Sequence, residues 1–343
     1  MTPIPTKFTF QWHINETCNR RCTHCYQTAY SDTGFDINGL LHVLNKLVAF
    51  LNGFEQNGKT PKAHINFTGG EPFLHTDFLS LLKEVKASRR FSFGILSNGY
   101  LLPQKELKKL YELGPKFIQI SLEGSKETND LIRGTGSYDE VSRALKTYQK
   151  AGIPTLLSFT ANANNYKELK PVSEAARKYG VFKVWTDRYL PSDHSDPLAL
   201  NKEQKQDYFS RIRKEQIRQK YRPFSKTRIA SNRALQFLMS GGKPYKCTAG
   251  TQLFTIMHNG IVYPCRRLPI ELGNILTDDL REIYDNHPVI KELHNPELLD
   301  TDCKVCAYST ACAGGLRCLS YAKFGNFSLQ DPDCGIHGLA GNP

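Results

Sequence analysis

The segment Cys18-Asn19-Arg20-Arg21-Cys22-Thr23-His24-Cys25 places three cysteines on one short loop, close behind an apolar run that predicts a β-strand. Three thiolates on one loop can hold three irons of a [4Fe–4S] cluster and leave the fourth iron without a protein ligand. An iron without a protein ligand can bind another molecule and take part in a reaction. Zinc is the alternative, but it usually takes its remaining ligand from a second Cys or His pair, and His24 would strain the loop. The loop therefore predicts an iron–sulfur cluster.

The ten cysteines of the 343-residue chain fall into two groups, three near the N-terminus and seven after residue 246. This clustering indicates metal ligation rather than a disulfide framework. The first residues lack the apolar core of a secretory signal, and no run approaches the roughly 18 apolar residues that cross a bilayer. We expect a cytoplasmic protein with no membrane partner.

The net charge of +12 is concentrated in residues 202–233, which contain many Lys and Arg residues but only three acidic ones. No aromatic stacking pattern accompanies this basic segment, so a nucleic-acid partner is not expected. Two interpretations stay open for it, a solvated helical face and a surface for an acidic peptide.

Short apolar runs alternate with amphipathic stretches through about the first 190 residues, which is the pattern of repeated βα units with parallel strands. The predicted strands are Phe8–Asn15, Ala63–Thr68, Phe91–Ser97, Phe117–Leu122, Thr155–Thr160 and Phe182–Asp187. The predicted helices are Leu40–Phe54, Thr76–Ala87, Lys105–Leu113, Tyr138–Ala151 and Tyr166–Tyr179. Six βα units fall short of the eight that close a full barrel.

Three further motifs follow predicted strands, namely Gly69-Gly70-Glu71-Pro72, Ser97-Asn98-Gly99 and Ser121-Leu122-Glu123-Gly124, the last continued by Arg133-Gly134. With the cysteine loop, they resemble the radical S-adenosylmethionine (SAM) enzymes. The resemblance implies an α/β fold, a partial (β/α)6 TIM-like barrel over residues 1–197. It also implies that the open iron chelates SAM, which an electron from the cluster cleaves to a 5′-deoxyadenosyl radical.

The resemblance also implies roles for single residues in binding SAM. Gly69 and Gly70 would let the backbone approach the ligand, and Glu71 would pair with the SAM ammonium. Asn98 would lie close to SAM or substrate, Ser121 would contact the ribose, and Arg133 would pair with the SAM carboxylate. Tyr26 would meet the adenine through its backbone, and Glu123 is a further candidate. Three of these residues have simpler explanations. Asn98 could belong to an ordinary Asn-Gly turn, Arg133 could lie on the surface of a helix, and the Tyr26 side chain could serve only in packing.

The tail, residues 241–343, follows a basic helical linker over residues 198–240 and is too poor in apolar periodicity to bury a large core. Its cysteines resemble the SPASM extension, except that five residues rather than three separate Cys312 from Cys318. Family order implies one fully ligated auxiliary [4Fe–4S] cluster on Cys303, Cys306, Cys312 and Cys334.

A second auxiliary cluster is then expected on Cys247, Cys265 and Cys318, with an open iron unless Cys318 fails to reach it. With the N-terminal cluster this makes three [4Fe–4S] clusters. Two zinc sites are the alternative, completed by one of the tail histidines.

The expected function is that of a maturase that abstracts a hydrogen from a ribosomally made peptide and forms a carbon–sulfur or carbon–carbon cross-link. Its partners would be a precursor peptide, an external electron donor of the flavodoxin or ferredoxin type, and a separate leader-binding protein unless the basic segment serves. Arg266 stands where the sulfatase-activating members have an Asp base, which argues against formylglycine formation. The alternatives are an enzyme of small metabolites or haem precursors, and a non-catalytic electron carrier.

Overall fold

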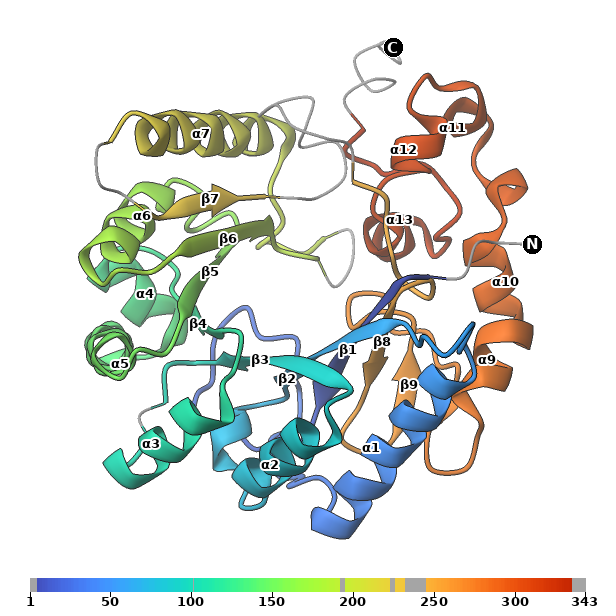
Figure 1. The fold of residues 1–343 in the computed structure, drawn as a ribbon. Coiled ribbons are helices and arrows are strands. Elements are labelled where there is room, and N and C mark those ends of the chain that lie inside the picture. The colour runs from blue at the N-terminus through green and yellow to red at the C-terminus, as the bar shows by residue number, and fades with distance from the viewer. Residues whose placement is uncertain (1–4, 101, 192–194, 223–225, 232–244, 335–343) are drawn as a thin grey trace. The chain divides into compact units, whose positions relative to one another are not determined.

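The computed structural model describes residues 5–100, 102–191, 195–222, 226–231 and 245–334, in an α/β arrangement (Figure 1). The chain folds into two compact units. The first unit comprises residues 1–121, 139–155 and 249–294, and the second comprises residues 122–138, 156–248 and 295–343. Each unit is therefore assembled from segments that are far apart in the sequence.

The strands of the first unit lie in the order β10-β9-β8-β1-β2-β3-β4. Their bounds are β1 Lys7–His13, β2 Lys62–Thr68, β3 Phe91–Ser97, β4 Ile118–Ser121, β8 Leu253–Ile256, β9 Ile261–Tyr263 and β10 Gly273–Asn274. Strands β8, β1, β2, β3 and β4 pair in parallel, whereas β9 and β10 add antiparallel pairs at one edge.

The helices of this unit are α1 Ile37–Asn52, α2 Phe78–Ser88, α3 Gln104–Leu113, α5 Ser137–Lys150, α9 Leu280–Asn286 and α10 Pro288–His294, with the 3₁₀ helix η1 Pro72–Leu74. Helices α1, α2 and α3 lie in a row beside the strands (Figure 1). Phe8, Phe10 and Trp12 alternate along β1 and are fully buried, as a strand in the middle of a sheet requires. Helix α1 begins where the Asp36 side chain accepts the Gly39 N–H.

The second unit contains the strands β5 Thr155–Ala161, β6 Lys183–Arg188 and β7 Arg228–Ala230, paired in parallel in that order. Its helices are α4 Lys126–Arg133, α6 Leu169–Lys178, α7 Lys202–Lys220, α11 Thr301–Val305, α12 Ser309–Cys312 and α13 Arg317–Phe324, with the 3₁₀ helix η2 Pro296–Leu298. Helix α7 packs on α6 and β7 (Figure 1). Its side chains Tyr208, Phe209 and Ile212 are buried. It therefore keeps an apolar face in spite of its many basic residues.

The six predicted strands and five predicted helices are all present, with ends shifted by at most three residues. The sheet of the first unit, however, extends into the tail, because β8 pairs with β1 from Thr9 opposite Leu253 to Trp12 opposite Ile256. Residues 249–294 thus belong to the compact unit that holds the N-terminal strands. None of the helices in the described part of the chain is long and apolar enough to cross a membrane.

Candidate functional site

The cysteine loop leaves β1 and is folded by its own backbone and by Asn98. The Cys25 N–H donates to the Cys22 carbonyl at 3.0 Å, and the Asn98 side-chain amide donates to the Cys18 sulfur at 3.7 Å. Cys18 and Cys22 are half-buried and Cys25 is exposed. Burial raises the pKa of the Cys18 thiol above its usual range. A metal that binds here must displace that proton.

Gly69 and Gly70 follow β2 and hold its end against the start of the cysteine loop. A Cβ at Gly69 would lie 2.4 Å from the Asn15 carbonyl oxygen, and one at Gly70 would lie 2.3 Å from the Thr17 carbonyl oxygen. The Gly70 N–H donates to the Asn15 carbonyl at 3.0 Å, and the Glu71 N–H donates to the Thr17 carbonyl at 2.8 Å. The two glycines therefore allow one backbone segment to approach another, which determines where the loop begins.

The Glu71 carboxylate is fully buried and links β2 to β3. It accepts hydrogen bonds from the Ser97 hydroxyl at 3.0 Å, the Asn98 N–H at 2.8 Å and the Phe73 N–H at 3.2 Å. Because Asn98 also reaches Cys18, one chain of hydrogen bonds joins Glu71 to the cysteine loop. Parallel sheets gather ligand sites at the carboxyl ends of their strands, which is where these residues lie.

The Glu71→Gln substitution is expected to weaken SAM binding by at least tenfold, because it removes the negative charge that would face the SAM ammonium. Gln keeps the size of the side chain and an acceptor for Ser97 or Asn98, so the fold and the iron content should persist. Equilibrium dialysis with labelled SAM on the reconstituted protein measures the effect. Unchanged SAM affinity together with wild-type iron content would make the role of Glu71 structural only.

Tyr26 and Ser121 complete the residues expected in the first unit. The Tyr26 ring is half exposed and its centroid lies 3.8 Å from the Arg266 guanidinium, with the His13 ring 6.0 Å away. Ser121 is the last residue of β4 and is half-buried. The cysteine loop, Gly69, Gly70, Glu71, Asn98, Tyr26 and Ser121 are therefore all in one compact unit.

Glu123 and Arg133 belong to the second unit, where they form a buried ion pair. Arg133 Nε and Nη2 lie 3.1 and 3.0 Å from Glu123 Oε1, and the Thr160 N–H donates to the other carboxylate oxygen. Only 1% of Glu123 and 9% of Arg133 is exposed. The arginine, predicted as a partner of the SAM carboxylate, is thus engaged by a protein carboxylate through two of its five donors.

The Arg133→Met substitution is expected to destabilise the protein by about 3–5 kcal/mol, since it leaves the Glu123 carboxylate buried without its cation. Anaerobic urea unfolding of the reconstituted protein measures the change. The double variant Glu123→Gln/Arg133→Met should recover part of the loss, because it removes the unpaired charge. Stability within about 0.5 kcal/mol of wild type in the single variant would contradict a buried pair.

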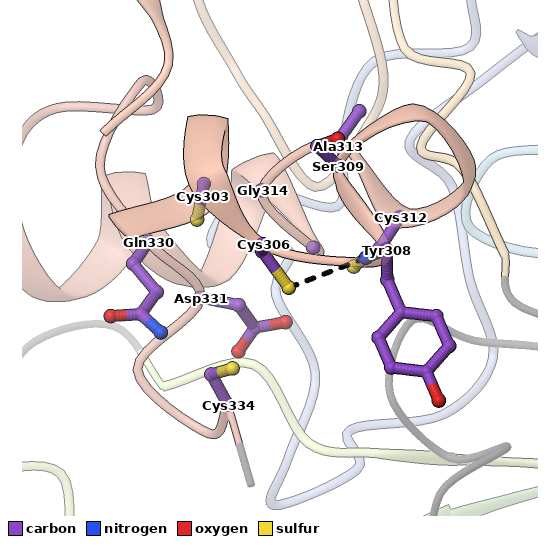
Figure 2. A pocket seen from close by; sticks show the side chains of 11 residues that line it. Cys303, Cys306, Tyr308, Ser309, Cys312, Ala313, Gly314, Gln330, Asp331 and Cys334 are labelled. Carbon is purple, nitrogen blue, oxygen red and sulfur yellow. Dashed lines mark hydrogen bonds between the residues drawn. The ribbon is translucent and has the colours of Figure 1, made fainter. Parts of the chain in front are cut away.

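Four tail cysteines of the second unit, Cys303, Cys306, Cys312 and Cys334, line one pocket around the turn after α12 (Figure 2). The Tyr308 N–H donates to the Cys306 sulfur at 3.4 Å. Among the described residues, no three His, Cys, Asp or Glu side chains converge as tightly as a single metal ion requires. Burial raises the pKa of Cys303 to about 12 and that of Cys312 to about 11, with neighbouring acidic groups and cysteines adding to it.

The segment between Cys312 and Cys318, which is two residues longer than the SPASM pattern, begins with a tight turn of three residues with positive φ. Ala313, Gly314 and Gly315 have φ values of 51°, 83° and 84°. A Cβ at Gly315 would lie 2.3 Å from Asp331, whose carboxylate accepts the Leu316 N–H. The turn leads into α13, where Cys318 is buried and does not line the pocket.

The remaining two expected ligands belong to different units, Cys247 to the second and Cys265 to the first. Both are half-buried. Cys265 lies in a short turn, in which its carbonyl accepts the Leu268 N–H at 2.9 Å. Their joint ligation of one cluster with Cys318 therefore stays a prediction.

Sequence reasoning missed the anchor of the last cysteine segment. Asp333, directly before Cys334, pairs with Arg188 at the end of β6 and with Lys205 of α7. These two cations hold the pKa of Asp333 below its usual range, although burial alone would raise it. Neither β6 nor α7 contains a recognisable motif, so only the folded chain brings these residues together.

Several positive charges of the basic segment, residues 202–233, are neutralised by acidic side chains. Arg211 pairs with Asp207 at 2.9 Å, Arg218 pairs with Glu215, and Lys205 pairs with Asp333. Lys214 is exposed on α7. Residues 223–225 and 232–233 of the segment lie outside the described residues.

Comparison with known proteins shows to which family the chain belongs. Residues 12–176 match the radical SAM superfamily, and residues 247–308 match SPASM, an iron–sulfur cluster-binding domain. The chain is a radical SAM enzyme with a SPASM domain. Its parallel sheet is typical of the radical SAM partial barrel, and the two matched domains are those of an enzyme that uses SAM and iron–sulfur clusters. Cys312, Cys318 and Cys334 lie beyond the matched SPASM residues.

Two curated relatives are similar over nearly the whole chain. The AdoMet-dependent heme synthase of Methanosarcina barkeri is 24% identical over 351 residues, covering 94% of this chain and 95% of that protein. Mycofactocin maturase MftC of Mycolicibacterium smegmatis is 25% identical over 346 residues, covering 94% of this chain and 80% of that protein.

A solved structure shares the fold. Native anSMEcpe with bound AdoMet and the Kp18Cys peptide superposes with a TM-score of 0.77 at 19% identity, covering 97% of this chain and 95% of that one. At this identity the likeness concerns the fold alone.

Proposed function

We propose that this radical SAM enzyme is a maturase that abstracts a hydrogen from a ribosomally made peptide and installs a carbon–sulfur or carbon–carbon cross-link. The observation that carries the proposal is the pairing of two features. One is a cysteine loop joined by hydrogen bonds to Glu71 and Asn98, and the other is a four-cysteine pocket in the tail. The likeness to a maturase over 94% of the chain supports the substrate class.

Cys18, Cys22 and Cys25 would hold a [4Fe–4S] cluster, and they fit it because three thiols lie on one loop, with the sulfurs of Cys18 and Cys25 already accepting hydrogen bonds. Hydrogen bonds to cluster ligands tune the reduction potential, so Asn98 would contribute to it. When bound, this cluster supplies the electron that cleaves SAM to a 5′-deoxyadenosyl radical.

Residues at the ends of β2, β3 and β4 would hold SAM beside that loop. Glu71 would orient the ammonium, Asn98 and Ser121 would offer polar contacts, and Gly69 and Gly70 would keep the backbone close. Tyr26 would lie beside the adenine of SAM. The role of Arg133 in binding the SAM carboxylate requires donors beyond the two it gives to Glu123.

The tail would hold two auxiliary [4Fe–4S] clusters. Cys303, Cys306, Cys312 and Cys334 would ligate one completely, and Cys247, Cys265 and Cys318 would leave an iron of the other open to a substrate thiolate or another donor. These clusters would accept the electron released when the product radical is oxidised. A fully ligated cluster and a cluster with an open iron differ in ligation and solvent exposure, and therefore in reduction potential. This difference can set the direction of electron transfer between them.

The partners in this proposal are the precursor peptide, a flavodoxin- or ferredoxin-type donor, and a separate leader-binding protein. Because Arg211 and Arg218 already pair within α7, exposed cations such as Lys214 are the better candidates for contact with an acidic leader. Exposed charges of this kind contribute mainly to the rate of association.

A second candidate function is the oxidation of a haem precursor. It is favoured by the AdoMet-dependent heme synthase relative, whose match covers 94% of this chain and 95% of that protein. The same clusters and the same SAM residues would serve, so the substrate alone distinguishes the two functions.

The test is anaerobic incubation of the reconstituted protein with SAM and reductant, in parallel reactions with the short peptide encoded beside its gene and with an iron coproporphyrin. Intact mass and fragmentation identify the product. A peptide maturase is expected to remove two hydrogens per cross-link from the peptide and to leave the porphyrin unchanged. A porphyrin product with an unchanged peptide would replace the proposal with the second function.

A further inference from the structure

A second pocket in the first unit adjoins the cysteine loop. Its lining includes His13, Glu16, Tyr26, Gln27, His258 and Arg266, and we call it the Arg266 pocket. It has a volume of about 70 Å³, whereas one water needs roughly 10–15 Å³ by the same kind of measure. The space therefore suffices for a small polar group such as a carboxylate.

The position of this pocket is that of a ligand site. His13 ends β1, and His258 comes two residues after the end of β8, the parallel neighbour of β1. Ligands of parallel sheets bind outside the carboxyl ends of adjacent strands. Tyr26 and Gln27 directly follow Cys25, and the Gln27 N–H donates to the Cys25 sulfur at 3.4 Å. A group bound here lies beside the cysteine loop.

Arg266 shares the pocket lining with one carboxylate, that of Glu16, which contacts His258 and not Arg266. Its guanidinium stacks on the Tyr26 ring at 3.8 Å, which covers one face and leaves the edge for hydrogen bonds. Within the described ranges no Asp or Glu forms an ion pair with it, and its buried Nε has no hydrogen-bond partner. A planar cation held in this way is suited to a carboxylate.

The carboxylates of Glu16, in the lining, and of Asp32, outside it, lie close to His258. His258 Nε2 lies 3.3 Å from Asp32 and 3.8 Å from Glu16, so the two acids share one imidazole. Burial, with Arg266 and His258 nearby, lowers the pKa of His13 to about 3, so His13 is neutral and offers hydrogen bonds only. Arg266 is thus the cation that a ligand would meet.

We propose that the Arg266 pocket binds a carboxylate of the substrate and holds the substrate beside the cysteine loop, with Arg266 as a specificity-determining residue. The proposal rests on the proposed function for the identity of the substrate. A carboxylate could also come from SAM, and the experiment separates these two sources.

The test uses two small probes on the reconstituted protein, N-acetyl-glutamate amide and its neutral match N-acetyl-glutamine amide. The cluster is paramagnetic when reduced, so a probe bound beside it shows enhanced proton relaxation. We expect enhanced relaxation for the acidic probe only. The Arg266→Gln substitution should weaken the affinity for this probe at least tenfold, and Arg266→Lys should retain part of the affinity. The matched control is Arg267→Gln, which removes the same charge one residue further along, outside the pocket lining.

Two results would overturn the proposal. Equal relaxation of both probes, or an unchanged effect in Arg266→Gln with wild-type iron content, would show that the pocket does not select a carboxylate. Displacement of the probe by SAM, with a tenfold loss of SAM affinity in Arg266→Gln, would assign the site to SAM. The relaxation experiment measures binding without turnover. Its result can therefore support the carboxylate site even if no peptide is modified, and a negative result leaves the outcome of the peptide assay unaffected.

Discussion

Replacing Cys18, Cys22 and Cys25 together by Ala is expected to lower the iron content from about twelve to about eight atoms per chain and to abolish formation of 5′-deoxyadenosine. The reason is that these three thiols are the only cysteines on the loop that Asn98 and the β2 end hold in place. Iron analysis and chromatography of anaerobic reactions with SAM and dithionite measure both quantities.

The matched control is the triple replacement of Cys303, Cys306 and Cys312, which should also remove about four irons but leave SAM cleavage in place. A difference between the two triple variants therefore separates loss of a cluster from loss of the SAM-cleaving cluster. An iron content unaffected by the first variant would contradict the assignment of the loop.

The second large effect is expected in the tail. The Cys303→Ala/Cys312→Ala variant should reduce formation of modified product at least a hundredfold while 5′-deoxyadenosine still forms. Both cysteines are buried in the four-cysteine pocket, and two remaining thiols are too few for a stable cluster. Product is read by intact mass and SAM cleavage by chromatography in the same reaction.

Cys318→Ala serves as the comparison for that variant, because Cys318 is buried on α13 and does not line the pocket. It should leave the spectrum of the fully ligated cluster intact. Normal product formation by the Cys303→Ala/Cys312→Ala variant would show that the fully ligated auxiliary cluster takes no part in the reaction.

The strands and helices of the βα region could be predicted because each carries its own local pattern. Phe8, Phe10 and Trp12 alternate along β1, and Asp36 marks the start of α1. Strand β8, by contrast, is only four residues long, Leu253–Ile256, and lies in a Cys- and turn-rich stretch. Its pairing with β1 joins residues more than 240 positions apart, and no local pattern specifies such a contact.

The candidate site shows the same division. The cysteine spacing and the Gly69-Gly70-Glu71-Pro72 motif identify Cys18, Cys22, Cys25 and Glu71 as a group, and the structure joins Cys18 and Glu71 through Asn98. The motif does not reveal that Gly69 and Gly70 accommodate the backbone of residues 15–17. That role depends on clearances of about one atom in the folded chain.

Partnerships of charged residues were the least predictable feature. Arg133 matched a family position but pairs with Glu123, and Lys205 belonged to a basic run but pairs with Asp333. A sequence shows which charges exist, whereas the fold decides which of them are within 4 Å of each other. Arg266 is informative for the opposite reason, since the fold leaves it without an acidic partner among the described residues.

The most direct test of the central claim is the formation of 5′-deoxyadenosine and methionine from SAM by the reconstituted wild-type protein under anaerobic reducing conditions. We predict equal amounts of both products, dependence on reductant, and none from the variant that lacks Cys18, Cys22 and Cys25. Protein that carries about twelve irons but leaves SAM intact, with reductant and substrate both present, would contradict the claim.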